Sequence, residues 1–353
     1  MALQKALIAM SGGVDSSVAA YLMKQNGYAC VGTTMLLYCD PSKSQTDIIQ
    51  DARSVADRMH IPFHVLDMQD PFKKCVMDSF ASAYESGLTP NPCVVCNRYL
   101  KFGFLMDTAL KLDCDKLVTG HYARVCFDPA SNRYLLKKAR DLPKDQTYFL
   151  YTLTQSQLKH ISFPLGDLTK EQVRQIAEEQ GFLNARKRDS QDICFIPDGD
   201  YYSFLRRYTG TQYSEGNYLD LSGKVVGRHK GAVAYTLGQR KGLGLAMGEP
   251  VYVCDKDMRA NTVTVGPNEA LFHRKLLAQD CNWISIDAPT SPIRVAAKAR
   301  SRMTEQPATV YTEENGQLRV EFDEPQRAIT PGQALVFYDG DTVIGGATIA
   351  KVL

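Results

Sequence analysis

The sequence predicts an α/β protein in which an N-terminal parallel-sheet domain is followed by a small central domain and a C-terminal β-barrel. Two observations predict it. Strand and helix signals alternate through the first half of the chain, which is typical of βαβ units and a parallel sheet. Past about residue 205 the helical periodicity fades, and short β-rich runs follow between turn signals such as Asn315-Gly316. We therefore expect domains at 1–204, 205–268 and 269–353.

The individual elements follow from apolar periodicity and from end signals. Gly27 suits the left-handed cap that ends a helix, and Pro62 ends the next one. Thr169 and Gln172 form a predicted capping box that opens a helix ending at Gly181. The predicted helices are 18–25, 48–59, 72–83, 96–111 and 169–181. The predicted strands are 6–10, 28–35, 63–66, 116–119, 317–322, 334–338 and 342–349.

The composition is that of a soluble globular protein, with 44% apolar and 23% charged residues among 353. The apolar run 6–10 is too short for a signal peptide or a membrane span, so we expect a cytoplasmic chain without a membrane partner. Its ten cysteines should then be thiols. A net charge of +2 indicates that a polyanion would have to meet a local basic patch. One candidate patch contains Arg133, Lys137, Lys138, Arg140 and Lys144, although such a cluster alone is more often a solvated face.

A glycine-rich loop follows the first predicted strand directly and opens the first predicted helix. It reads SGGVDSS from Ser11 to Ser17. Two glycines allow close backbone approach, and the helix N-terminus offers free N–H groups and the positive end of its dipole. Ser16 and Ser17 add hydroxyl donors. The loop is therefore a predicted phosphate cradle, and it lacks the Gly-Lys-Ser/Thr ending of a Walker A loop.

This loop resembles the SGGxDS loop of the PP-loop ATP pyrophosphatase superfamily, whose nucleotide-binding domain is adenine nucleotide α-hydrolase-like. Members cut ATP between the α- and β-phosphates and adenylate a carbonyl oxygen. The resemblance implies ATP and Mg²⁺ as cofactors here, with AMP and pyrophosphate as products. A nucleophile then displaces the adenylated oxygen, and in different members it is a nitrogen or a sulfur.

The cysteines favour sulfur. Cys93 and Cys96 form a CxxC pair beside a predicted helix start, and a helix N-terminus lowers the pKa of a thiol. Cys194 follows Arg186, Lys187 and Arg188, whose charges would also favour a thiolate there. Two other interpretations stay open. Cys194 could be a core thiol before Phe195 and Ile196, and the CxxC pair could bind zinc, although a closed zinc site needs four ligands.

Seven motifs in order resemble those of the bacterial tRNA-specific 2-thiouridylase (MnmA) family, over nearly the whole chain. They lie at 9–17, 89–97, 119–122, 144–149, 190–196, 236–242 and 330–333. The family has a PP-loop catalytic domain, a small central domain and a β-barrel. The resemblance implies ATP-dependent 2-thiolation of the wobble uridine of lysine, glutamate and glutamine tRNAs, with a cysteine desulfurase or sulfur-relay protein as sulfur donor. We expect a monomer.

The resemblance also implies residue roles. The position of Cys194 carries a persulfide, and that of Cys96 is the nucleophile that resolves it through a transient disulfide. Target-base contacts fall on Asn91, Pro92 and Cys93. The positions that match ATP-binding residues are Ala9, Met10, Ser11, Gly12, Gly13, Val14, Asp15, Ser16, Met35 and Gly120. The positions that match tRNA-binding residues are His121, Lys144, Asp145, Gln146, Arg300, Ser301 and Gln333.

Two positions depart from the family pattern. Many members have Asp where this chain has Cys93, and an aromatic residue where Ser301 stands between Arg300 and Arg302. With Cys93 present, Cys96 and Cys194 could join it to hold a [4Fe–4S] cluster that passes hydrosulfide to the base. The persulfide route and this cluster route are both open from the sequence.

Two other functions account for parts of the sequence but not for all of it. A nitrogen-transferring PP-loop ligase would need neither reactive cysteines nor a tRNA surface. A non-catalytic RNA-binding module with a structural zinc would leave the phosphate loop unexplained.

Overall fold

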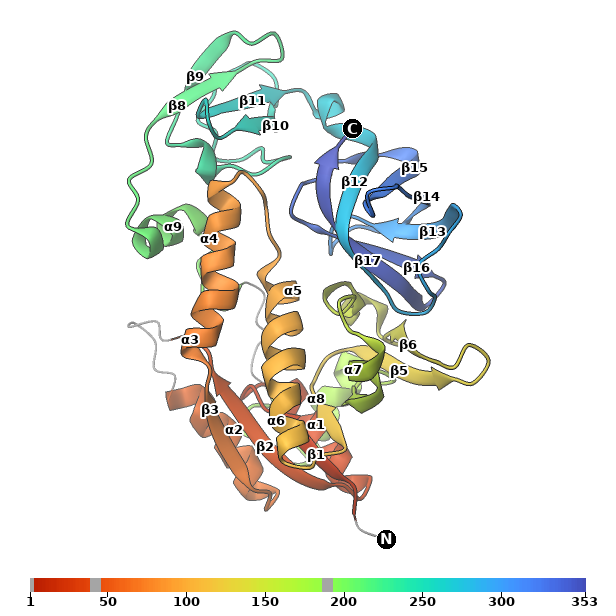
Figure 1. The fold of residues 1–353 in the computed structure, drawn as a ribbon. Helices are drawn as coiled ribbons and strands as arrows, with labels where there is room; N and C mark the ends of the chain where they lie inside the picture. The colour runs from red at the N-terminus through yellow and green to blue at the C-terminus, as the bar shows by residue number, and fades with distance from the viewer. Residues whose placement is uncertain (1–2, 39–45, 186–192) are drawn as a thin grey trace.

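The computed structural model describes residues 3–38, 46–185 and 193–353. The N-terminal region, at the red end of the chain in Figure 1, forms a five-stranded sheet in the order β3-β2-β1-β4-β7. All neighbouring strands run parallel. The order reverses beside β1, and such sheets bind ligands beyond the carboxyl ends of the strands at that point. The strands are β1 (Lys5–Ala9), β2 (Ala29–Leu36), β3 (Phe63–Asp67), β4 (Lys116–Val118) and β7 (Ile161–Ser162).

Helices cover both faces of this sheet, because a parallel sheet buries both of its faces. Side chains alternate along β1, so that Ala6 and Ile8 join one apolar core and Leu7 joins another. The first core includes α1 (Val14–Gln25), α2 (Thr46–Arg58) and α8 (Lys170–Glu179), and the second includes α6 (Leu105–Lys111) and α7 (Gln155–His160).

Two long helices extend from the sheet toward the rest of the molecule (Figure 1), and both contain π-helical turns. The first joins α3 (Gln69–Phe72), η1 (Lys73–Met77) and α4 (Asp78–Glu85), and the second joins α5 (Pro92–Cys96), η2 (Asn97–Phe104) and α6. The second helix begins at Pro92, four residues before the predicted start, because Asn91 caps it. Asn91 Oδ1 accepts hydrogen bonds from the N–H groups of Cys93 at 3.1 Å and Val94 at 3.4 Å. Both cysteines of the CxxC pair therefore lie within the helix.

The C-terminal region is a closed barrel. Its strands pair in the order β12-β15-β14-β13-β16-β17, and an additional pairing of β12 with β17 closes the ring. The strands are β12 (Phe272–Trp283), β13 (Ile293–Lys298), β14 (Gln306–Thr312), β15 (Leu318–Arg327), β16 (Ala334–Asp339) and β17 (Thr342–Val352). Between the sheet and the barrel, α9 (Tyr201–Thr209) precedes a four-stranded sheet in the order β10-β11-β8-β9. Its strands are β8 (Gly216–Leu219), β9 (Val225–His229), β10 (Tyr252–Asp257) and β11 (Thr262–Gly266). The predicted fold class is confirmed.

A hairpin that the sequence analysis missed joins the N-terminal region to the barrel. It consists of β5 (Ala123–Asp128) and β6 (Arg133–Lys138), and β6 pairs with β17. Its basic side chains, expected as a candidate polyanion patch, instead form ion pairs. Arg133 Nη1 lies 2.8 Å from Asp287 Oδ1. Lys137 Nζ lies 3.3 Å from Asp341 Oδ1, and Lys138 Nζ lies 2.6 Å from Glu305 Oε2. These ion pairs attach the hairpin to the barrel and partly neutralise three of the basic side chains of the candidate patch.

No described helix is long and apolar enough to cross a membrane.

Candidate functional site

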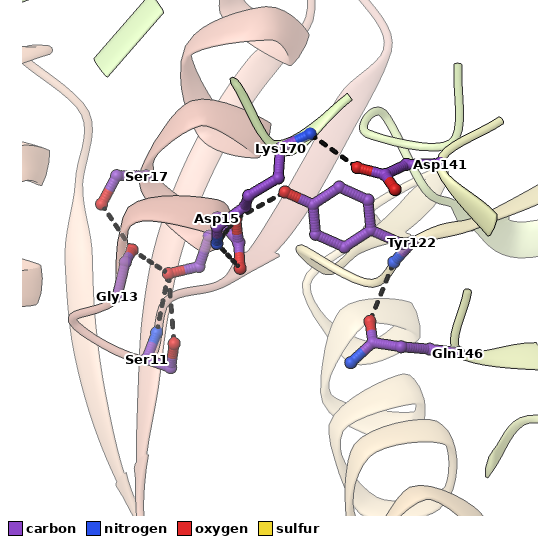
Figure 2. Close-up of polar contacts among 9 residues, drawn as sticks. Ser11, Gly13, Asp15, Ser17, Tyr122, Asp141, Gln146 and Lys170 are labelled. Carbon is purple, nitrogen blue, oxygen red and sulfur yellow. Dashed lines mark hydrogen bonds and ion pairs between the residues drawn. The ribbon is translucent and has the colours of Figure 1, made fainter. Parts of the chain in front are cut away.

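The glycine-rich loop turns at the carboxyl end of β1, where Gly12 adopts a φ of +69°. Ser16 and Ser17 were expected to donate to phosphate, but both hydroxyls donate to the carbonyl of Gly13 at 3.0 Å (Figure 2). Ser16 Oγ also accepts the N–H of Ser11 at 3.1 Å. The serines therefore hold the loop in shape. The first N–H groups of α1 have no partner within the helix, and groups of this kind can bind an anion.

Asn184 supports this loop from a distant part of the chain and was missed from the sequence. Its side-chain Nδ2 donates to the carbonyl of Gly12 at 3.1 Å and to Ser17 Oγ at 3.0 Å, and the residue is buried. No local pattern marks this asparagine, because its partners lie more than a hundred and fifty positions earlier.

Replacing Asn184 by alanine should therefore destabilise the protein. Two buried hydrogen bonds would be lost, and we expect the free energy of unfolding to fall by about 1–3 kcal/mol. Urea unfolding measures the change, with Asn315→Ala as the control, since the Asn315 amide is exposed and bonds only within its own turn. Equal losses in the two variants would contradict a special role for the buried amide.

The loop that follows β4 packs directly against the phosphate loop. A Cβ atom added to Gly120 would lie 2.8 Å from the carbonyl carbon of Asp15 and from the nitrogen of Ser16. Only glycine allows this approach. On the other side, Met10 N donates to Thr33 O at 2.7 Å, which extends the pairing of β1 with β2 toward Met35. The structure thus brings the expected ATP-site residues of 9–16, Met35 and Gly120 to one edge of the sheet.

A cavity of about 760 Å³ opens between the parallel-sheet region, the central region and the barrel. Cys93, Asn97 and Lys101 line it from one face of the long helix, because residues four apart in a helix share a face. Other lining residues are Tyr84, Thr89, Pro90, Asn91, Pro92, His121, Gln146, Phe149, Ile193, Tyr201, Thr236, Leu237, Gly238, Gln239, Arg300, Ser301 and Gln333. Many of the residues expected to contact tRNA or the target base therefore meet here, whereas Lys144 and Asp145 are not part of the lining.

Cys194 is exposed, and its neighbours explain its position. The Phe195 ring packs edge-on against Phe72 and Phe80, with ring centroids 5.6 and 5.4 Å apart, and Ile196 is buried. This anchor places Cys194 at the surface of the apolar cluster, so the core-thiol interpretation is wrong. Arg186, Lys187 and Arg188 lie outside the described residues.

The three thiols influence one another and share one cation. The side chains of Cys93 and Cys194 reach the surface, but the protein packed around each thiol partly removes its water and raises its pKa. The negative charges of Cys96 and Cys93 raise the pKa of Cys194 further. Cys96 is buried, which raises its pKa as well. Lys101 opposes the rise at all three. For Cys93 and Cys96 the expected lowering of the thiol pKa is therefore wrong, because desolvation outweighs the charge of Lys101. For Cys194 the cations on which that expectation rested lie outside the described residues.

Replacing Lys101 by methionine should make these thiols less reactive. At a fixed pH near 8 the thiolate fraction falls when the cation is removed, so we expect alkylation of Cys93 and Cys194 by iodoacetamide to slow severalfold. In the wild type, the rate should keep rising above pH 9, because the pKa values are raised. Mass spectrometry of the alkylated peptides measures both rates. Lys111→Met, at an exposed position on the same helix, is the control, and identical rates in the two variants would refute the effect.

Metal binding does not fit the described thiols. Within residues 3–38, 46–185 and 193–353, no three His, Cys, Asp or Glu side chains come together to hold a metal ion. Cys93, Cys96 and Cys194 are free thiols. They do not form the ligand set that a [4Fe–4S] cluster or a structural zinc requires, so we derive no step through a metal centre.

Several residues expected to contact tRNA also hold the protein together. Gln333 Nε2 donates to the carbonyl of Thr89 at 2.7 Å, just before the CxxC helix. Arg300 Nη2 donates to the carbonyl of Leu237 at 3.1 Å and to Thr330 Oγ1. Asp145 accepts hydrogen bonds from Ala139 N and from Thr147 Oγ1, and burial raises the pKa of its carboxyl. Burial lowers the pKa of His121 well below its usual value, so this ring is neutral at pH 7.

Comparison with known proteins agrees with this arrangement. The tRNA methyl transferase HUP domain family matches residues 4–198, its PRC-barrel domain family matches 202–267, and the aminomethyltransferase β-barrel domain family matches 273–349. A U34-tRNA thiolase from Methanococcus maripaludis, solved with its [4Fe–4S] cluster, is 17% identical over 58% of this chain and 66% of its own. Its TM-score is 0.37.

Relatives of known name align over their full length. The tRNA-specific 2-thiouridylase MnmA of Acetivibrio thermocellus is 46% identical over 99% of this chain and 100% of its own. The protein of the same name from Clostridioides difficile is 46% identical over 99% of each chain. Identity at this level over the whole length shows that the chain belongs to the tRNA-specific 2-thiouridylase family.

Proposed function

We propose that this enzyme uses ATP to adenylate the C2 oxygen of the wobble uridine of a tRNA, and then replaces that oxygen with sulfur. One observation carries the proposal. Gly120 packs on the phosphate loop, and the next residue, His121, lines the cavity. A nucleotide on the loop and a base in the cavity would therefore meet across two adjacent residues.

The proposed reaction has three steps. The C2 oxygen attacks the α-phosphorus of ATP, and the bond to pyrophosphate breaks. The terminal sulfur of a Cys194 persulfide then attacks C2, and the bond between C2 and oxygen breaks as AMP leaves. Finally, the Cys96 thiolate attacks Cys194 Sγ. The S–S bond to the base breaks, 2-thiouridine is released, and a Cys96–Cys194 disulfide remains for an external dithiol to reduce.

The environment of the thiols supports this order of events. Because desolvation raises the pKa of the Cys194 thiol, an ordinary thiol at this position would be a poor nucleophile. A persulfide is more acidic than a thiol and would supply the anion that the second step needs. Exposure of Cys194 suits transfer of sulfur from a protein donor, for which a cysteine desulfurase or sulfur-relay protein is our proposal.

The cavity suits a single flipped uracil base. Tyr84, Phe149 and Tyr201 supply aromatic faces, which stack bases in RNA recognition. Neutral His121 and the amides of Gln146 and Gln239 supply hydrogen-bonding groups without charge. We assign base contacts to Asn91, Pro92 and Cys93, and further tRNA contacts to His121, Lys144, Asp145, Gln146, Arg300, Ser301 and Gln333. The proposed substrates are the lysine, glutamate and glutamine tRNAs.

Mg²⁺ would arrive with the ATP phosphates, since this ion keeps most of its ligands from water and phosphate. The one carboxylate of the phosphate loop, Asp15, is already bonded to Lys170 and Tyr122. We therefore assign no protein ligand to the ion. The enzyme is proposed to act in the cytoplasm as a monomer, with domain limits at 1–204, 205–268 and 269–353.

Product analysis tests the adenylation. With a lysine tRNA transcript, ATP should be converted to AMP and pyrophosphate, and a transcript with cytidine at the wobble position should suppress the conversion. Release of ADP and phosphate, or turnover indifferent to the wobble base, would overturn the proposal. A nitrogen-transferring ligase would instead release AMP only when ammonia or an amine is supplied as the nucleophile, and it would not need Cys194.

A further inference from the structure

Asp15 raises an electrostatic problem in the phosphate loop. It is the one acidic residue between Ser11 and Ser17, and it lies in the first turn of α1. An anion bound at a helix N-terminus gains from the dipole and the free N–H groups. A carboxylate at the same place would repel a bound triphosphate and cancel part of that attraction.

Two residues from outside the loop bind this carboxylate (Figure 2). Lys170 Nζ donates to Asp15 Oδ1 at 2.8 Å and to Oδ2 at 2.9 Å, and Tyr122 donates its hydroxyl to Oδ1 at 2.8 Å. The Lys170 side chain is 6% exposed and that of Asp15 is 31% exposed. The charges therefore meet in a place where water screens them weakly.

The fold fixes both partners before any ligand binds. Lys170 is the first residue of α8, and its backbone N–H donates to Asp141 Oδ2 at 2.8 Å. Gln146 holds Tyr122 through two hydrogen bonds of 2.9 Å. The side-chain Oε1 of Gln146 accepts the backbone N–H of Tyr122, and the backbone N–H of Gln146 donates to the carbonyl of Tyr122. Gln146 also lines the cavity.

We propose that Lys170 and Tyr122 are positioning residues for nucleotide binding. Lys170 cancels the charge of Asp15, and Tyr122 fixes its orientation, so that the loop keeps a positive potential for polyphosphate. The inference rests on the proposed use of ATP and adds to it the residues that make the loop receptive to anions.

Calorimetric titration of the full chain in EDTA tests this, with ATP and adenosine as probes. Lys170→Met leaves the Asp15 charge uncompensated and should weaken ATP binding by about 10–100-fold, the usual range for losing a charged hydrogen bond. Adenosine, which lacks phosphate, should bind as in the wild type. Lys170→Arg should largely retain ATP affinity, and Lys159→Met, at an exposed position on α7, is the matched control.

The decisive variant carries both Asp15→Asn and Lys170→Met. With the carboxylate neutralised, ATP affinity should return to within a fewfold of the wild type, even if Lys170→Met alone fails to fold. A double variant that binds ATP poorly, or a Lys170→Met variant that binds ATP normally, would overturn the inference and leave the proposed function standing. Failure of the wild type to bind ATP, with Mg²⁺ restored, would overturn both.

Discussion

Replacing Cys194 by alanine should reduce 2-thiouridine formation by about a thousandfold or more, which is the usual consequence of removing a covalent nucleophile. The structure gives the physical reason. Phe195 and Ile196 anchor the segment in an apolar cluster, while Cys194 itself is exposed next to the cavity-lining residue Ile193. Among the described thiols, only Cys194 and Cys93 combine exposure with electrostatic coupling to Cys96.

The assay for this variant is single-turnover thiolation of a lysine tRNA transcript. ATP affinity and tRNA affinity should stay within about twofold of the wild type, because a side chain that acts only in the chemical step does not contribute to binding. Cys126→Ala, at an exposed cysteine on the β5–β6 hairpin, is the control and should be fully active. Comparable rates in the Cys194 variant and in this control would exclude the persulfide route.

Replacing Gly120 by alanine should weaken ATP binding and slow thiolation, each by about 10–100-fold. The new Cβ would lie 2.8 Å from two backbone atoms, of Asp15 and Ser16, so the phosphate loop would have to move. A displacement of about 1 Å at a reacting centre costs about a hundredfold in rate. The same movement would shift the nucleotide relative to the base, because His121, the residue after Gly120, lines the cavity proposed for the base.

The control for this prediction is Gly223→Ala. Gly223 has a φ of +86°, so alanine would be strained there, but its Cβ would meet no atom within 4 Å. It should cost some stability and leave ATP affinity unchanged. If both variants bind ATP equally well, the close contact between the two loops is not required for nucleotide binding.

The parts of the site that depend on short stretches of chain could be predicted from the sequence. A strand, a glycine-rich turn and a helix start specify the phosphate loop within a few residues. The burial of Phe195 and Ile196 is also a local pattern, although it left open whether Cys194 follows them inward. The helix start was placed four residues too late, because the cap by Asn91 was not recognised.

The remaining parts depend on contacts between distant residues. Lys170 meets Asp15 across 155 positions, and Tyr122 meets it across 107. No local signal marks such partners. The strands of the hairpin 123–138 pair locally with each other, and the sequence analysis missed them. The acids that pair with Lys137 and Lys138 lie in the barrel, about two hundred positions later, where no local signal marks them. The direction of the pKa shifts at Cys93 and Cys96 was wrong because a sequence shows the helix start and the nearby charges but not the desolvation of the thiols.

The most direct test of the account is mass spectrometry of tRNA nucleosides after reaction with the wild-type protein. The reaction would contain a lysine tRNA transcript, ATP, Mg²⁺, a dithiol, and a cysteine desulfurase with cysteine as the sulfur source. We expect 2-thiouridine at the wobble position only when ATP and the sulfur source are both present. A folded, ATP-binding protein that forms no 2-thiouridine under these conditions would contradict the account.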